Sequence, residues 1–343
     1  MKSLIRKLVE AYGPPGREDA IRDIVADEIR ENVQSIEISP MGSLHAFVNK
    51  GGKRRVMLAA HMDEIGIIIS HIDQRGFARF QPVGNVDLET LRGQGVRFPG
   101  DIVGVFGVDL ERSREKPPRI GDFFIDFGAD GKQSCPVDIG DFGVFDRPFL
   151  DLGRRLVAKS LGGRIGVAIL MEVIRQLPET PHELQFAFTV QEEVGRRGGT
   201  TSAYMLDPEI GIAVEVTATG DTSSKRKLAV VLGKGPAIKV WDSRMLSDPY
   251  LIRHMAIVAN ETGIAYQMDV LQSGDTDIPC IQLTRAGVSW GCISIPARYR
   301  HTPSEMVDYR DVEEAVRLLL EIIKRPMDFG EEDKDQVKQS RVS

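Results

Sequence analysis

The sequence has 343 residues, with 44 lysines and arginines against 50 aspartates and glutamates, 42% hydrophobic residues and three cysteines. This apolar fraction and mixed charge are typical of a folded globular protein and exclude a disordered chain. The net charge of −6 argues against a nucleic-acid partner, which would call for a basic face. The cysteines lie far apart, at Cys135, Cys280 and Cys292, which excludes a disulfide framework and favours the reducing cytoplasm.

No segment predicts a signal peptide or a membrane span. The N-terminal apolar residues fall at helical spacing and are interrupted by charges. The longest apolar runs, such as Ile65–Ile69, are far shorter than the ~20 residues that a membrane helix needs. We therefore expect no membrane partner.

The first part of the chain predicts an α/β fold. Residues 3–33 indicate two helices separated by the breaker GPPG, and β-rich runs follow at 35–39, 44–49 and 55–61. The third run, RVMLAAH, is nearly all apolar, which is typical of a strand buried on both faces of a sheet.

Helical periodicity is absent between about residues 73 and 156. Short alternating runs lie there between Gly, Asp and Pro turns, which predicts a small all-β barrel or sandwich. We expect residues 1–72 and 157–343 to form the α/β domain and residues 73–156 to form an inserted β domain.

The α/β alternation resumes at Arg164. The last predicted helix carries an apolar face from Val312 to Ile323, with Asp311 as its expected N-cap. The elements expected before it are helices at 166–176, 201–206 and 249–260 and strands at 183–191, 211–216 and 288–295.

Two histidines and several carboxylates follow or interrupt these predicted strands. His61 and Asp63 end the RVMLAAH strand on one face, and a metal-bound imidazole commonly donates its other N–H to a carboxylate. A surface pair that is merely hydrogen-bonded is the alternative. His301 likewise follows an apolar strand.

Glu192 and Glu193 end another apolar strand. Successive strand residues face opposite sides, so one carboxylate is a candidate metal ligand and the other a candidate general base. A charged strand end in solvent is the alternative. Glu215 lies inside an apolar strand, where a carboxylate is costly unless a cation or hydrogen-bond donors meet it. Together this donor set favours zinc or cobalt over magnesium, and hydrolysis with two metals about 3.5–4 Å apart is a natural chemistry for it.

The sequence resembles the glutamyl/deblocking aminopeptidases, co-catalytic metallopeptidases that assemble into hollow tetrahedral particles and are also labelled cellulase or endoglucanase M. The resemblance covers nearly the whole chain and rests on segments in a fixed order: EAYGPPGREDAIRDIV, AAHMDEIG, RFQPVGNVD, VFDRPF, RIGVAILMEVIRQL, TVQEEVGRRGG, SGDTDIPCI and ISIPARYRHTPSEMV. It implies a mixed sheet flanked by helices, in which the inserted β domain serves dimerisation and dimers assemble to a dodecamer.

The resemblance also implies roles for single residues. His61 and Glu215 would bind one metal, with Asp63 orienting His61, and Glu193 and His301 would bind the other. Glu192 would be the general base. The implied activity is removal of N-terminal residues from peptides, with zinc or cobalt, up to two ions per chain.

One position departs from the family's pattern. The family has Asp-Asp before Arg-Ile-Gly, and its first aspartate bridges both metals, whereas this chain has Gly162 and Gly163. Each metal would then keep two protein ligands against the three expected for a catalytic zinc. Glu215 or Asp221 are candidates to compensate.

This departure keeps two other functions open. The chain is alternatively a degenerate member that acts as a structural or peptide-binding subunit. Glycoside hydrolysis is a second alternative, suggested by the endoglucanase label and the paired carboxylates, although adjacent strand glutamates facing opposite ways fit it poorly.

Overall fold

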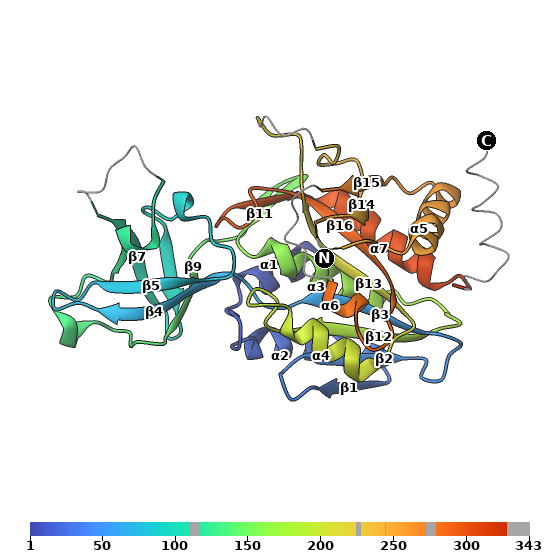
Figure 1. Cartoon of the computed structure of the whole chain (residues 1–343), viewed down its shortest axis with the longest axis horizontal. Coiled ribbons are helices and arrows are strands. Elements are labelled where there is room, and N and C mark those ends of the chain that lie inside the picture. The colour runs from blue at the N-terminus through green and yellow to red at the C-terminus, as the bar shows by residue number, and fades with distance from the viewer. Residues whose placement is uncertain (110–116, 224–227, 244, 272–278, 328–343) are drawn as a thin grey trace.

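The computed structural model describes residues 1–109, 117–223, 228–243, 245–271 and 279–327. These residues form a large α/β body, with a smaller β-barrel that projects from one side of it (Figure 1). The predicted class, a mixed α/β fold with a small all-β unit, is confirmed. No helix in this described part of the chain is long and apolar enough to cross a bilayer.

A mixed sheet forms the centre of the α/β body. Its main path runs in the order β1-β2-β12-β3-β13-β16-β17-β11-β10, and two further strands, β14 and β15, extend it beside β16. The 11 strands among the described residues are β1 (Ser35–Ile38), β2 (Leu44–Val48), β3 (Arg55–His61), β10 (Leu150–Leu152), β11 (Arg155–Ala158), β12 (Glu183–Thr189), β13 (Ile210–Ala218), β14 (Ala237–Trp241), β15 (Gln267–Val270), β16 (Ser289–Arg298) and β17 (Glu305–Asp308).

The four central strands are parallel, and this arrangement determines where a site can form. β12, β3, β13 and β16 run in the same direction, with His61 at the end of β3 in register with Thr189 at the end of β12. The carboxyl ends of parallel strands meet at one edge of a sheet, which is where α/β folds place ligands.

The barrel is a closed, six-membered ring of antiparallel strands with its own apolar core. Its first strand begins at Gly66, upstream of the expected boundary at residue 73. In addition, β10 and the first half of β11 lie inside the expected insert but belong to the large sheet. In ring order its strands are β4 (Gly66–Ile72), β5 (Ala78–Val83), β8 (Phe123–Asp126), β7 (Ile102–Val108), β6 (Gly95–Phe98) and β9 (Phe142–Phe145).

Helices cover both faces of the large sheet. α1, α2, α3, α5 and α7 share the main core cluster, while α4 and α6 pack on a smaller cluster on the opposite face. The α3 helix begins earlier than the expected helix, so that Gly162 and Gly163 lie in its first turn. The helices are α1 (Lys2–Glu10), α2 (Asp19–Ile29), α3 (Leu161–Arg175), α4 (Arg197–Leu206), α5 (Pro249–Thr262), α6 (Pro279–Gln282) and α7 (Tyr309–Ile323).

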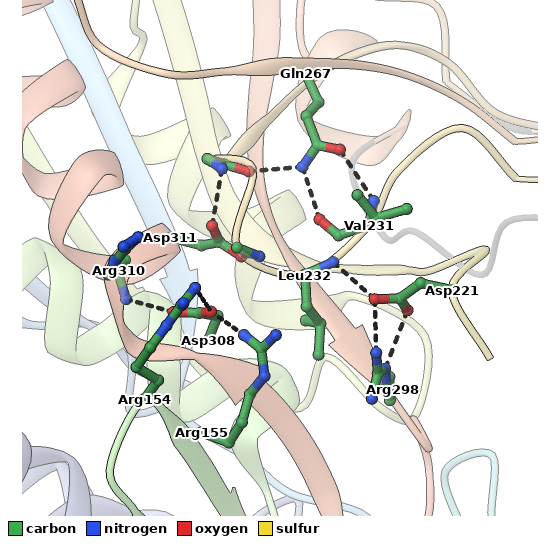
Figure 2. Close-up of polar contacts among 12 residues, drawn as sticks. Arg154, Arg155, Asp221, Val231, Leu232, Gln267, Arg298, Asp308, Arg310 and Asp311 are labelled. Atoms are coloured by element: carbon green, nitrogen blue, oxygen red, sulfur yellow. Dashed lines mark hydrogen bonds and ion pairs between the residues drawn. The ribbon is translucent and has the colours of Figure 1, made fainter.

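The predicted N-cap of the last helix is wrong. Asp308 caps α7, accepting a hydrogen bond from the backbone N–H of Arg310. Asp311 is fully buried and instead accepts hydrogen bonds from the N–H groups of Gly233 and Gly235, which ties that loop to α7 (Figure 2). Both aspartates fit the cap pattern, and only the loop that folds over the helix distinguishes them.

A buried histidine is expected to make the folded chain less stable at acidic pH. His45 on β2 is 1% exposed, with Nε2 2.8 Å from the hydroxyl of Ser202, and burial lowers its pKa from 6.5 to about 4. Between pH 6.5 and pH 4, His45 binds a proton in the unfolded chain but not in the folded chain. The contribution of neutral His45 to the free energy of unfolding is therefore fully present above pH 6.5. It is lost as the pH falls toward 4, at a cost of roughly 3 kcal/mol.

Urea unfolding at pH 7.0 and pH 4.5 tests this expectation. The wild-type free energy of unfolding should fall more between these pH values than that of His45→Gln, which keeps a polar partner for Ser202 without the titration. Equal losses in the two proteins would contradict the role of His45.

Candidate active site

One cavity of about 260 Å³ lies at the carboxyl edge of the central strands. It is lined by all the predicted metal ligands and the predicted base, which come from distant stretches of the chain: His61, Asp63, Glu192, Glu193, Glu215 and His301. Gly162 and Gly163 line the same cavity. The SGDTDI part of the SGDTDIPCI segment lies outside the described residues.

His61 and Asp63 have the arrangement that their spacing predicted. Nδ1 of His61 lies 3.4 Å from Oδ1 of Asp63, and both side chains are buried. Asp63 also accepts hydrogen bonds from the backbone N–H groups of Glu192 and Glu193, at 3.0 and 2.9 Å. One carboxylate therefore lies beside the imidazole and also holds the loop that carries the two glutamates.

The expectation that Glu192 and Glu193 face opposite sides of a strand is wrong. β12 ends at Thr189, and Gln191 has φ +55°, so the chain has left the extended conformation before the glutamates. Both can therefore turn to the same side. Their ligand atoms and one nitrogen of His61 all lie within 4.8 Å of one another.

This three-residue cluster fits a divalent cation. One imidazole nitrogen and one oxygen from each carboxylate lie close enough to hold a cation, or to hold it with one carboxylate beside it as a base. Burial raises the pKa of Glu193 to about 7, with His61 opposing the rise and Asp63 and Glu305 adding to it. A bound cation would relieve this crowding of negative charge.

Glu215 and His301 line the cavity but are not part of that cluster. Glu215 lies within β13, between β3 and β16, and burial raises its pKa while the charges of Lys239, His61 and Arg300 oppose the rise. A solvent-facing edge position is thereby excluded for Glu215. His301 lies with Nδ1 3.0 Å from the side-chain amide of Asn85.

Sequence reasoning did not identify Glu305 as a site residue. Glu305 begins β17 and is buried, and its carboxylate accepts hydrogen bonds from the N–H groups of Gly162 at 2.8 Å and His301 at 2.9 Å. Burial raises its pKa, and these two donors oppose the rise. Its position four residues after His301 was the available signal, but only the fold shows that it faces Gly162.

Gly162 and Gly163, the two positions that differ from the resembled family, have different surroundings. A Cβ on Gly162 would lie 3.8 Å from the nearest oxygen of Glu305, which is ordinary contact distance. A Cβ on Gly163 would lie 2.4 Å from Cε1 of His61, so the imidazole packs against the backbone where a side chain would project. A side chain at position 162 would therefore have space, whereas the space beside Gly163 is already occupied by the imidazole of His61.

Asp221 does not supply the missing carboxylate. Its two oxygens accept hydrogen bonds from the guanidinium of Arg298 at 3.0 and 2.7 Å, and one also accepts the N–H of Leu232 (Figure 2). The hydrogen bonds from Arg298 lower the pKa of Asp221 to about 2. Asp221 is absent from the cavity lining and instead holds the loop that leads to Gly233.

Removing the charge of Glu64, which lines the cavity, is expected to lower the stability of the fold strongly. Its carboxylate is fully buried and pairs with Lys159 at 2.5 Å and Arg164 at 3.3 Å, both also buried. Glu64→Gln would leave two buried cations without their counter-charge, so we expect a loss of about 3–5 kcal/mol in the free energy of unfolding. Glu37→Gln, which breaks an exposed pair with Lys50, should cost at most about 1 kcal/mol. Equal losses in denaturant titrations would contradict this prediction.

One imidazole and several carboxylates thus converge on one cavity at a parallel-strand edge, where they could hold a divalent cation. The chain belongs to the M42 glutamyl aminopeptidase family, whose profile matches residues 42–318, and it is accordingly an aminopeptidase-type hydrolase.

Individual relatives agree with this assignment. The chain is 38% identical over 325 residues to a putative aminopeptidase of Acetivibrio thermocellus, covering 94% of this chain and 98% of that protein. It is 35% identical to a lysyl aminopeptidase of Pyrococcus furiosus, covering 95% and 98%. The structure is similar to an aminopeptidase from the archaeon Desulfurococcus kamchatkensis, with a TM-score of 0.90, 36% identity and 94% coverage of each chain.

Proposed function

We propose that the cavity removes N-terminal residues from peptides with the help of a bound divalent cation, zinc or cobalt. The observation that carries the proposal is the convergence of His61, Glu192 and Glu193 within 4.8 Å at the end of two parallel strands. A cation held there supplies Lewis acidity to water and to the scissile carbonyl. Glu215 and His301, in the same cavity, are the further candidate ligands.

The roles of the other residues follow from their contacts. Asp63, whose Oδ1 lies 3.4 Å from Nδ1 of His61, would favour the tautomer that presents Nε2 to a metal. Glu192 is the general base: it takes a proton from the attacking water and later donates it to the leaving amine. Glu193, whose pKa burial raises, is stabilised as a carboxylate by the cation.

A direct assay tests this function. Purified protein, dialysed against chelator and reloaded with Zn²⁺ or Co²⁺, is assayed on aminoacyl-p-nitroanilides of different side chains and on short peptides. We expect stepwise release from the N-terminus that is lost with chelator. No release on any substrate, with metal content shown by elemental analysis, would overturn the proposal.

The alternative of a catalytically degenerate subunit rests on one observation. Gly162 and Gly163 offer no side chain where the resembled family has two aspartates. A metal-free protein that binds peptides without cleaving them would support this alternative. The glycosidase alternative is less favoured, because an oxygen of Glu192 and one of Glu193 gather around the same nitrogen of His61, whereas glycoside hydrolysis needs two carboxyl groups that flank a sugar bond ~5–9.5 Å apart.

We also propose a homo-oligomer in the cytoplasm, built from dimers that assemble to a dodecamer. The archaeal PhTET1 structure, 29% identical with a TM-score of 0.86 over 95% of this chain and 99% of that one, is a dodecamer. Val103 and Val105 on β7 are 43% and 49% exposed, which suits a barrel that serves dimerisation. The cytoplasmic location rests on the scattered cysteines. Light scattering should give twelve times the 38.0-kDa chain mass.

A further inference from the structure

We propose that the guanidinium of Arg300 takes the place of a second metal ion: the cavity binds one divalent cation, and Arg300 supplies the other positive charge that the scissile carbonyl oxygen meets. The proposal rests on the aminopeptidase function above. Arg300 was not among the residues that the sequence singled out, although it directly precedes His301.

The local backbone directs Arg300 toward the cavity. After β16 ends, Tyr299 and His301 both adopt the left-handed conformation, with φ +58° and +62°. Non-glycine residues rarely adopt this conformation, which persists where the surrounding structure requires it. The turn that these two residues form places both Arg300 and His301 in the cavity wall.

The charge of Arg300 acts on the carboxylates of the same cavity. Its guanidinium opposes the rise in the pKa of Glu193, Glu215 and Glu305 alike. These three carboxylates come from different elements, and all three line the same cavity as Arg300. That is the electrostatic position in which a second cation would otherwise be stabilised.

Within the described residues, no structural ion pair neutralises Arg300. Lys159 and Arg164 are buried next to the cavity-lining Glu64, and both are paired with it. Arg300, by contrast, forms no ion pair within 4.0 Å with any described residue, and its Nε is buried without a hydrogen-bond partner there. Its charge and its N–H donors therefore remain available to a ligand.

The glycine pair explains why a second cation is not held. Gly162 provides no carboxylate between the His61 cluster and His301, and the space at Gly163 is filled by the imidazole of His61. Glu193 belongs to the first cation's cluster, and Glu215 lines an adjoining hollow together with His61 and Glu192, on the side of that first cation. This leaves His301 and the already hydrogen-bonded Glu305 for another ion. Two donors are fewer than the three that a catalytic zinc keeps.

Arg300 would act where charge develops in the reaction. Water attacks the carbonyl carbon, its proton passes to Glu192, and the C–N bond breaks as that proton reaches the leaving amine. In the tetrahedral stage the former carbonyl oxygen is negative, and N–H groups aimed at it stabilise it more strongly than they stabilise the ground state. A planar guanidinium with several donors is suited to this role.

Metal counting tests the proposal without relying on turnover. After dialysis against Zn²⁺ at a fixed free concentration, we expect one ion per chain in wild type, in Arg300→Ala and in Gly162→Asp, and two in the double variant Gly162→Asp/Arg300→Ala. The double variant regains a carboxylate and loses the competing cation. Two ions in wild type, or one in the double variant, would overturn the proposal whether or not the protein is active.

Kinetics test the catalytic part. Arg300→Ala should lower kcat by about 10²–10³-fold with little change in KM, as for loss of an oxyanion donor, and guanidinium ions in the assay should restore part of it. Arg317→Ala, at an exposed site, is the matched control. A kcat within threefold of wild type would overturn the catalytic role. If the wild-type protein itself has no activity, the proposed function fails, but the metal count still tests whether Arg300 replaces a second cation. Thermal unfolding checks that Arg300→Ala is folded.

Discussion

Replacing Glu192 by glutamine is expected to lower kcat by about 10²–10⁴-fold, the range that a positioned general base contributes. The amide keeps the size of the side chain but cannot accept the proton of the attacking water. KM should change little, because the substrate contacts remain. Stopped assays with the Co²⁺-loaded protein on its best aminoacyl substrate would measure the effect.

Metal content separates the two roles open to Glu192. Its carboxylate is close enough to His61 and Glu193 to act as a ligand as well as a base. If Glu192 is the base, the variant should retain its metal while losing turnover. Loss of metal together with turnover would assign Glu192 as a ligand and contradict the base role. Glu31→Gln, at an exposed helix end, controls for the substitution itself.

Gly162→Asp is expected to tighten metal binding by about tenfold or more, since it adds a carboxylate at the position where the resembled family has its bridging aspartate. The space exists: the new Cβ would lie 3.8 Å from Glu305. Gly163→Asp is expected to have the opposite effect, because its Cβ would lie 2.4 Å from the imidazole of His61 and displace that ligand. Titration with a fluorescent zinc chelator compares the two variants directly.

The alanine pair isolates sterics from charge. Gly162→Ala should leave metal affinity unchanged, whereas Gly163→Ala should weaken it, since the clash with His61 requires only a Cβ. Equal affinities for Gly162→Asp and Gly163→Asp would show that the two positions are equivalent, contrary to the packing of His61. Introducing aspartate at both positions at once is therefore a less informative experiment than introducing it at position 162 alone.

Local patterns predicted the parts of the molecule that short-range physics controls. The apolar run before His61 forms a buried parallel strand, and the loss of helical periodicity after β3 corresponds to the barrel. The candidate ligands could be selected because polar groups at the ends of apolar strands are costly unless they are used. Their convergence in one cavity followed from parallel strands sharing an edge.

Patterns failed where the chain departs from regular structure. Strand alternation misassigned Glu192 and Glu193, because the strand ends at Thr189 and Gln191 turns the chain. The cap rule placed the N-cap at Asp311 although Asp308 caps the helix, because the rule contains no information on the loop that Asp311 holds. Both errors concern the boundary of an element, β12 at its end and α7 at its start. Contacts with neighbouring segments determine such boundaries.

By itself, the sequence determined the α/β class, the barrel and the set of imidazoles and carboxylates that face one edge, because hydrophobic period and residue chemistry are local properties. Only the tertiary structure decided that Glu305 and Arg300 belong to the cavity, that His61 fills the space at Gly163 and that Asp221 is engaged by Arg298. Each of these depends on contacts between segments far apart in the chain, and the balance of charge within a buried cavity is a sum over all of them.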